Sequence, residues 1–310
     1  MTSHGRTAAI GTLDEPRTTP HTGTMQAVYK SERGRRAVQQ WCSQALAGAD
    51  FPISTMALDT GAGWIQLTSA GTGRPRILMV PGTGSNAAAA LPWLRALSAR
   101  WPTTIVDLPG QPGLSDQYRP RRARLAWYGR VLEEILALTQ MDDVVLVGNS
   151  LGAAVALAAS SPRIAARALI SPAGYIRLTI DPKLASASAA WLLRPTVDRT
   201  RSMLRLFVAS GQNPPETEVE WMTLVAANCR TTLAPPPLPA QLLTDRAQRP
   251  CVVGVGEHDR FLPPRRLAPA VRRSMNLDLR VLPKMGHLTT PEHLDGVANL
   301  IAEVVDPPRS

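Results

Sequence analysis

Short apolar runs alternate with segments of helical spacing over most of the chain from residue 76 onward. Six of these runs predict strands: residues 76–80, 103–107, 144–147, 168–170, 251–255 and 277–282. Between them apolar positions recur at helical spacing, most clearly over residues 123–139 and 151–159. Continuously apolar strands separated by helices are typical of a mostly parallel sheet covered on both faces. The pattern therefore predicts an α/β fold.

The N-terminal part of the chain follows a different pattern. Residues 31–49 have the spacing of an amphipathic helix, and two alternating runs, 53–58 and 64–68, flank the turn sequence DTGAG and predict a β-hairpin. Residues 1–24 mix charges of both signs with Pro and Thr, so they predict a disordered tail without the apolar centre of a signal peptide. A cytoplasmic location is expected, and Met25 is an alternative start to Met1.

Residues 171–250 interrupt the alternation because they carry no strand pattern. Helices are predicted there at residues 184–193, 197–209 and 218–228, and the Pro-rich run 235–239 is interpreted as a stiff connector. An interval of this length is too long for a simple crossover. We therefore expect a core formed by residues 25–172 and 250–310, with residues 173–249 as a helical lid over one edge of the sheet.

Length, charge, the longest apolar runs and the cysteines together exclude several classes of protein. The 310 residues suffice for one substantial core. The net charge is +10, but only three of the 34 basic residues are Lys and the basic residues are scattered, which argues against nucleic-acid binding. The apolar runs are too short for a membrane span. Cys42, Cys229 and Cys251 are odd in number and far apart, so they indicate reduced thiols rather than disulfides or a zinc site.

A polar serine stands where the apolar strand at 144–147 turns into a helix. The sequence Gly148-Asn149-Ser150-Leu151-Gly152 fits the G-x-S-x-G turn that presents a nucleophile between a strand and a helix. Side chains at 148 and 152 would collide in so tight a turn, which explains the glycines. The serine would project above the sheet at a helix N-terminus, where developing negative charge is favoured. Ser150 is therefore the candidate nucleophile.

A serine hydroxyl needs a base, and the base needs an orienting acid. Of the five histidines, His287 is the best candidate because it follows the last predicted strand. Asp259 follows the strand at 251–255 and is the candidate acid; Glu257 is the competing carboxylate and His258 the competing imidazole. The order Ser, Asp, His is the one expected for a triad after the G-x-S-x-G turn.

An acyl-transfer site also needs donors for the oxyanion. One backbone N–H is expected from Leu151, directly after the nucleophile. The second is expected from the glycine-rich loop after the strand at 76–80, most plausibly from Thr83. The same loop lacks the Gly-Lys-Ser/Thr of a phosphate-binding loop.

Five motifs together resemble one fold family. They are PGTG at 81–84, DLPGQPGLS at 107–115, GNSLG at 148–152, GEHD at 256–259 and GH at 286–287. With them, residues 29–305 resemble an α/β-hydrolase of the carboxylesterase-like branch. The resemblance implies an eight-stranded, mostly parallel sheet flanked by helices, a lid inserted after strand six, and no cofactor or metal. Pro81 departs from the family's usual His before Gly82, but donation by backbone beyond Gly82 is expected to survive.

The expected function is hydrolysis of a small-molecule carboxylic ester or thioester by Ser150, His287 and Asp259 through an acyl-enzyme. The lid carries apolar side chains, which favour a substrate with a hydrophobic portion; Trp191, Phe207 and Trp221 are the candidate substrate-binding residues. Two alternatives stay open: a non-hydrolytic lyase or cyclase of natural-product metabolism on the same fold, and a ligand-binding receptor with little turnover. A monomer or homodimer is expected, without a nucleic-acid partner or a membrane span.

Overall fold

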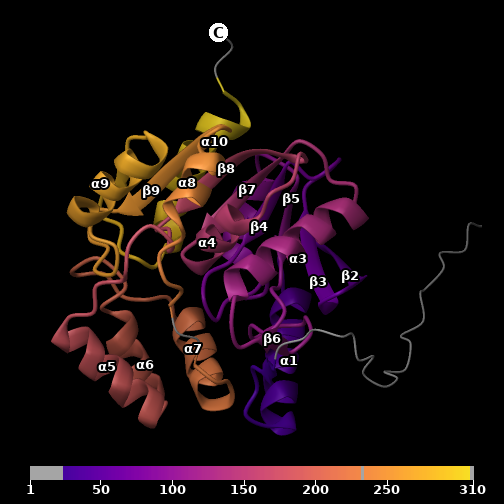
Figure 1. Cartoon of the computed structure of the whole chain (residues 1–310). Helices are drawn as coiled ribbons and strands as arrows, with labels where there is room; N and C mark the ends of the chain where they lie inside the picture. The colour runs from indigo at the N-terminus through magenta and orange to yellow at the C-terminus, as the bar shows by residue number, and fades with distance from the viewer. Residues whose placement is uncertain (1–23, 232–233, 308–310) are drawn as a thin grey trace, which may run out of the picture.

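The computed structural model describes residues 24–231 and 234–307 and is built around an eight-stranded sheet (Figure 1). In spatial order the strands are β10 (Arg280–Leu282), β9 (Cys251–Gly256), β8 (Ile164–Ile170), β7 (Val144–Asn149), β4 (Ile77–Val80), β5 (Thr103–Val106), β3 (Gly63–Ala70) and β2 (Ser54–Thr60). Neighbours from β10 to β5 are parallel, whereas β3 pairs antiparallel with β5 and β2. The predicted mostly parallel sheet and the hairpin are confirmed.

The order of the strands reverses at β4. From β4 the chain passes to β5 on one side and later returns to β7 on the other side of β4. Open α/β sheets bind their ligands at such a reversal, outside the carboxyl ends of the strands. The loop that begins at Pro81 follows β4 and Ser150 follows β7, so both lie at this position.

Helices cover both faces of the sheet. One face packs against α2 (Leu91–Ser98) and α10 (Leu294–Val305), and the other against α3 (Arg124–Leu138), α4 (Leu151–Ala158), α8 (Ala240–Arg246) and α9 (Pro264–Met275). Strand β7 shows how the sequence serves both layers: Val144 and Leu146 face the second set of helices, whereas Val145 and Val147 face the first. Side chains of a strand point alternately to its two faces, which explains the continuously apolar run.

The helix predicted over residues 31–49 is α1 (Glu32–Ala47), whose N-terminus is capped by the Ser31 side chain. A two-stranded sheet of β1 (Met25–Ala27) and β6 (Tyr118–Pro120) has no counterpart in the sequence prediction. The predicted tail, residues 1–24, lies outside the described residues except for Thr24. Among the described helices, none is long and apolar enough to cross a membrane.

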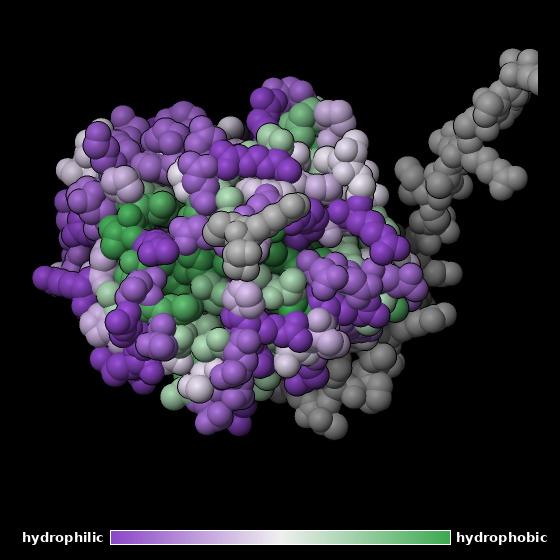
Figure 2. Space-filling view, turned by 90° about the horizontal axis from the view of Figure 1, so that it is seen from above, coloured by the Kyte–Doolittle hydropathy of each residue, from purple (hydrophilic) through white to green (hydrophobic). Residues whose placement is uncertain are grey.

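Four helices lie between β8 and β9, the sixth and seventh strands of the large sheet in chain order. They are α5 (Pro182–Leu193), α6 (Val197–Leu204), α7 (Glu216–Asn228) and α8. Figure 1 shows α5, α6 and α7 together at one end of the molecule, and Figure 2 looks onto the opposite end, where apolar side chains gather in the middle of a hydrophilic surround. The helical content of this interval agrees with the prediction, and its assignment as a lid stays a prediction.

Some boundaries were predicted wrongly. Strand β8 begins at Ile164, and the helix predicted to reach residue 209 ends at Leu204. After Leu204 the chain tightens into a turn in which the Phe207 N–H donates to the Leu204 carbonyl, and the Phe207 carbonyl accepts the Leu288 N–H at 2.8 Å. Beyond Leu204 the chain therefore pairs with a segment that is distant in sequence, which helical spacing does not reveal.

Candidate active site

Ser150 lies on the tight turn between β7 and α4. Its backbone angles, φ 51° and ψ −112°, are strained for a residue with a side chain. A Cβ atom on Gly152 would overlap the Val80 carbonyl oxygen, and one on Gly148 would overlap the backbone of Ala153. The two glycines are therefore needed for the turn, and the turn holds the serine at the carboxyl edge of the sheet.

The structure brings together the three side chains expected to form a triad. The Ser150 Oγ lies 3.0 Å from His287 Nε2, and His287 Nδ1 lies 2.8 Å from Asp259 Oδ2. The His287 side chain is 12% exposed and that of Asp259 is fully buried. Because an ionised carboxylate only accepts hydrogen bonds, Nδ1 carries the ring proton and Nε2 is left to accept the proton of the serine hydroxyl.

Asp259 is held by both of its carboxylate oxygens. While Oδ2 faces His287, Oδ1 accepts the backbone N–H groups of Phe261 and Leu262, each at 2.9 Å. Burial raises the pKa of Asp259, but the neighbouring His287 ring and the Leu262 N–H lower it by more, so that it lies below its usual range. The carboxylate is therefore ionised at neutral pH and fixed in orientation.

The competing side chains lie elsewhere. The Glu257 carboxylate accepts the Lys284 N–H and lies 3.7 Å from His258 Nε2; both of these side chains are about half exposed. His293 Nδ1 lies 2.8 Å from the Thr290 Oγ1. Asp259 and His287 are thus the pair that reaches Ser150.

The loop that carries His287 is positioned by close backbone contacts. A Cβ atom on Gly286 would overlap the Phe207 carbonyl, and one on Gly256 would overlap the Gly286 carbonyl. The His258 N–H also donates to the Met285 carbonyl at 2.8 Å. Because these contacts join main-chain atoms, the loop has little freedom to move, and the position of the His287 imidazole is fixed with it.

Backbone N–H groups close to Ser150 are available for an oxyanion. A Cβ atom on Gly82 would lie 3.6 Å from the Ser150 Cβ, which brings the loop after β4 next to the serine. Within residues 24–231 and 234–307, neither the Leu151 N–H nor the Thr83 N–H donates to a protein acceptor. Their role as oxyanion donors stays a prediction.

The loop after β4 is held by hydrogen bonds to both main-chain polar groups of one residue, Gly84. The Gly84 N–H donates to Gln111 Oε1 at 3.0 Å, and the Gly84 carbonyl accepts the Trp221 indole N–H at 2.8 Å. Gln111 is itself buried and its amide donates to the Tyr128 hydroxyl at 3.2 Å. Sequence reasoning missed Gln111 as a positioning residue, although it lies inside the DLPGQPGLS motif.

The three aromatic residues expected to contact substrate occupy different places. The Phe207 ring centroid is 4.6 Å from that of Phe261 and 6.2 Å from that of His287, so Phe207 lies beside the triad. Trp191 packs against a cluster of residues from α6 and α7, which Phe207 also contacts. Trp221 is fully buried against Trp41, with ring centroids 4.6 Å apart, and has no surface through which to contact a substrate in this conformation.

Ser171 is a second residue that the sequence pattern does not single out. It follows β8 with a φ of 44° and is fully buried. Among the described residues its hydroxyl has no partner in good hydrogen-bond geometry. Of the influences on the pKa of Asp259, burial is the largest and raises it, whereas Ser171 is the smallest of those that lower it, after His287 and Leu262. A buried, strained serine beside the carboxylate is a candidate positioning residue.

The sequence pattern shared by the alpha/beta hydrolase family matches residues 77–300. No curated protein matches the chain. Solved structures do: carboxylesterase CesB (YbfK) from Bacillus subtilis has a TM-score of 0.74 and 17% identity over 89% of this chain and 100% of its own. Naproxen esterase (carboxylesterase NP) from Bacillus subtilis has a TM-score of 0.71 and 18% identity, covering 88% of this chain and 98% of its own.

A third similar structure is named for a different hydrolytic reaction. The meta-cleavage product hydrolase from Pseudomonas fluorescens has a TM-score of 0.65 and 18% identity, and the match covers 82% of this chain and 98% of that one. At such identities the structural likeness establishes the fold and leaves the reaction to be argued from the site.

Proposed function

The chain belongs to the alpha/beta hydrolase family, and from that premise we propose that it is a serine hydrolase that cleaves a carboxylic ester or thioester with a hydrophobic portion. The proposal rests above all on one observation, the hydrogen-bonded chain from the Ser150 hydroxyl through His287 to Asp259. The names of two similar structures, a carboxylesterase and a naproxen esterase, favour the same class of reaction.

In the proposed mechanism the Ser150 Oγ attacks the carbonyl carbon while its proton passes to His287 Nε2. The electron pair of the C=O bond moves to oxygen, and the N–H groups of Thr83 and Leu151 receive this oxyanion. His287 then protonates the leaving alcohol or thiol as the bond to it breaks. Water attacks the acyl-enzyme in the same way and regenerates Ser150.

Asp259 contributes without changing its own protonation. Its ionised carboxylate holds the Nδ1–H tautomer of His287 and stabilises the imidazolium that forms during each proton transfer. Burial raises the pKa of Asp259, but His287 and the hydrogen-bond donors around the carboxylate lower it by more. The carboxylate therefore keeps its negative charge. Helices α5 to α7 act as the lid, and Phe207 supplies part of the hydrophobic binding surface beside the imidazole.

Covalent labelling with a fluorophosphonate tests the proposal. We expect the wild type and Ser186→Ala, an exposed serine on α5, to be labelled, and Ser150→Ala not to be labelled. His287→Ala should label more slowly by at least about 10³-fold, since it lacks the base. Labelling that persists in Ser150→Ala contradicts the proposal.

The two rival functions differ in what happens after attack. A lyase or cyclase would place no oxygen from isotopically labelled water in the product, whereas hydrolysis through an acyl-enzyme places one there. A receptor with little turnover would release no burst of p-nitrophenol from a short-chain p-nitrophenyl ester. Incorporation of label together with a burst is the result that we expect.

A further inference from the structure

Glu218 is an acidic residue on the inward side of α7, in the interval proposed as the lid. With about 100° of rotation per helical residue, Glu218 points about 60° away from Trp221 and lies one turn before Met222 on the same side of the helix. Trp221 and Val225 on this side contact the loop after β4: the indole donates to the Gly84 carbonyl, and Val225 Cγ1 is 3.8 Å from where a Cβ on Gly84 would lie.

On the other flank of Glu218, α7 packs toward the imidazole. Val219 and Met222 belong to an apolar cluster that includes Phe207. The Phe207 ring in turn lies 6.2 Å from the His287 ring, and the Phe207 carbonyl accepts the Leu288 N–H. On the helical wheel Glu218 therefore lies between side chains that contact two structures next to Ser150: the loop that carries the Thr83 N–H, and Phe207, whose carbonyl binds the loop that carries His287.

The Glu218 carboxylate has no partner within the described residues. No hydrogen bond or ion pair from residues 24–231 or 234–307 engages its carboxylate, although the neighbouring Glu216 pairs with Arg201 at 2.7 Å. The side chain lies deep among protein atoms yet keeps partial exposure. Burial alone raises its pKa to about 7, and no cation of the described chain opposes that effect.

We propose that Glu218 is a substrate-binding residue that receives a positively charged, ammonium-type group of the substrate. A carboxylate without a countercharge is unfavourable away from water, and a ligand cation removes that cost. The inference rests on the proposed function and specifies it: the ester carries a cation as well as its hydrophobic portion. The aromatic and apolar side chains near Phe207 hold the hydrophobic portion, and Glu218 holds the charge.

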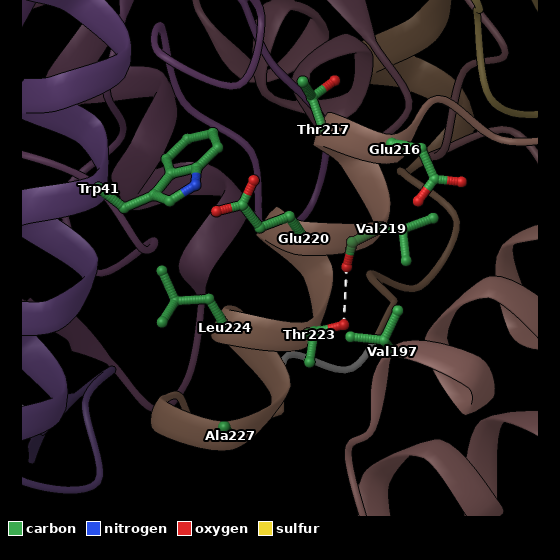
Figure 3. A pocket seen from close by; sticks show the side chains of 9 residues that line it. All are labelled: Trp41, Val197, Glu216, Thr217, Val219, Glu220, Thr223, Leu224 and Ala227. Atoms are coloured by element: carbon green, nitrogen blue, oxygen red, sulfur yellow. Dashed lines mark hydrogen bonds between the residues drawn. The ribbon is translucent and has the colours of Figure 1, made fainter.

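The opposite side of α7 supplies a matched control. Figure 3 shows Glu216 and Glu220 beside a separate open pocket of about 530 Å³, whose lining also includes Trp41 and Leu224. Glu220 lies two residues from Glu218 and so points about 160° away from it, and it is exposed. Substitution of Glu220 changes the charge of the same helix on the side away from Glu218.

Two pairs of esters with the same shape and different charge test the inference. Butyrylcholine is compared with 3,3-dimethylbutyl butyrate, and ethyl 4-(trimethylammonio)butanoate with ethyl 5,5-dimethylhexanoate. Dissociation constants are measured by calorimetry on Ser150→Ala, which leaves the esters intact. We expect the charged member of at least one pair to bind tenfold more tightly or better. Glu218→Gln in the same background should abolish that preference, and Glu220→Gln should retain it.

Two results would overturn the role of Glu218: equal binding of both members in both pairs, or a charge preference that survives Glu218→Gln. Hydrolysis of the same esters by the protein with Ser150 intact is measured separately. Charge-dependent binding without any hydrolysis would reject the serine hydrolase and leave the cation site standing. Hydrolysis without charge preference would do the reverse. Glu218→Gln keeps the shape of the side chain and removes an unpaired buried charge, so we expect this variant to fold.

Discussion

The carboxyl edge of the sheet contains a buried carboxylate and the helical interval α5–α8 a partly buried one, and the protein surrounds the two differently. Asp259 at the sheet edge accepts hydrogen bonds from His287, Phe261 and Leu262, and its pKa is lowered despite burial. Glu218 on α7 has no protein partner among the described residues, and burial raises its pKa to about 7. At the sheet edge the protein itself supplies the hydrogen-bond donors of Asp259. In the helical interval it supplies none for Glu218, which in our proposal binds a cation of the substrate.

The two regions also differ in how their geometry is maintained. At the sheet edge, Gly148, Gly152 and Gly286 allow main-chain atoms to touch, so the positions of Ser150 and His287 follow from the backbone. In the helical interval, Trp221 acts through a side chain that reaches the Gly84 carbonyl. Substitutions at the edge should therefore cost more than substitutions in the helices, and the predictions below are ordered accordingly.

The largest effect should come from the sheet edge with the backbone left intact. In Asp259→Asn, Oδ1 can still accept the Phe261 and Leu262 N–H groups, but the amide facing His287 favours the wrong imidazole tautomer. We expect kcat for a p-nitrophenyl ester to fall by about 10⁴-fold with little change in KM. Circular dichroism checks that the fold is retained. A loss smaller than tenfold would show that Asp259 does not orient the base.

Crowding at the Ser150 turn should make Gly152→Ala severely destabilising. Its Cβ would overlap the Val80 carbonyl, and main-chain atoms cannot move aside cheaply. We expect a loss of about 3 kcal/mol or more in the free energy of unfolding, measured with urea. Gly296→Ala, at an exposed position of α10, is the matched control, since nothing lies within 4 Å of its Cβ, and it should be neutral or stabilising by up to ~1 kcal/mol. If the free energy of unfolding changes by a similar amount in the two variants, a Cβ atom at position 152 is not crowded as described.

A contact that joins the two regions should have an intermediate effect. Trp221→Phe removes the donor to Gly84 and leaves a buried carbonyl unsatisfied, which typically costs about 1–3 kcal/mol. Because the loop also carries the Thr83 N–H, we expect kcat to fall by roughly tenfold while KM changes little. Trp41→Phe is a comparison that keeps the ring packing and does not touch the loop. If the two variants lose equal activity, the hydrogen bond has no part in positioning.

The smallest effect concerns the pH dependence of stability. The folded protein holds a proton on Glu218 up to about pH 7, whereas the unfolded chain releases it near the ordinary glutamate value of 4.5, so this residue makes stability fall as pH rises between these values. Glu218→Gln removes that dependence. Relative to the wild type, the variant should gain on the order of 1 kcal/mol between pH 5 and pH 8 in urea titrations. A constant difference across this range would mean that Glu218 is not desolvated.

Much of the fold and part of the site could be predicted because their signals are local. The strand-to-helix step around Ser150 is visible in consecutive residues, and the glycines report a steric need within the same turn. Asp259 and His287 could be predicted from a weaker rule: in open α/β sheets the ligand-binding residues lie just after the carboxyl ends of the strands. Gln111 and Ser171 were not, because their importance depends on contacts with Gly84 and Asp259 that lie far along the chain.

The helical interval shows the limit most clearly. Helical spacing marked Trp191, Phe207 and Trp221 alike as apolar, and it cannot tell which element each side of a helix will meet. Packing distinguishes them: Phe207 and Trp191 contact the same cluster on α6 and α7, but of the two only Phe207 also lies beside His287, and Trp221 is buried under Gly84. The same holds for the end of α6, where a hydrogen bond from Leu288 replaced a further helical turn.

By itself, then, the sequence determined the alternation of strands and helices and the strained turn at Ser150, because periodicity and steric fit act between near neighbours. Tertiary structure alone decided that an imidazole 137 residues away reaches the hydroxyl and that a carboxylate 28 residues before that imidazole accepts a hydrogen bond from its Nδ1–H. It also decided that Glu218 turns inward without a partner while Glu220 turns outward. These outcomes depend on how whole elements pack, and the free energy of packing is shared among residues that no local pattern connects.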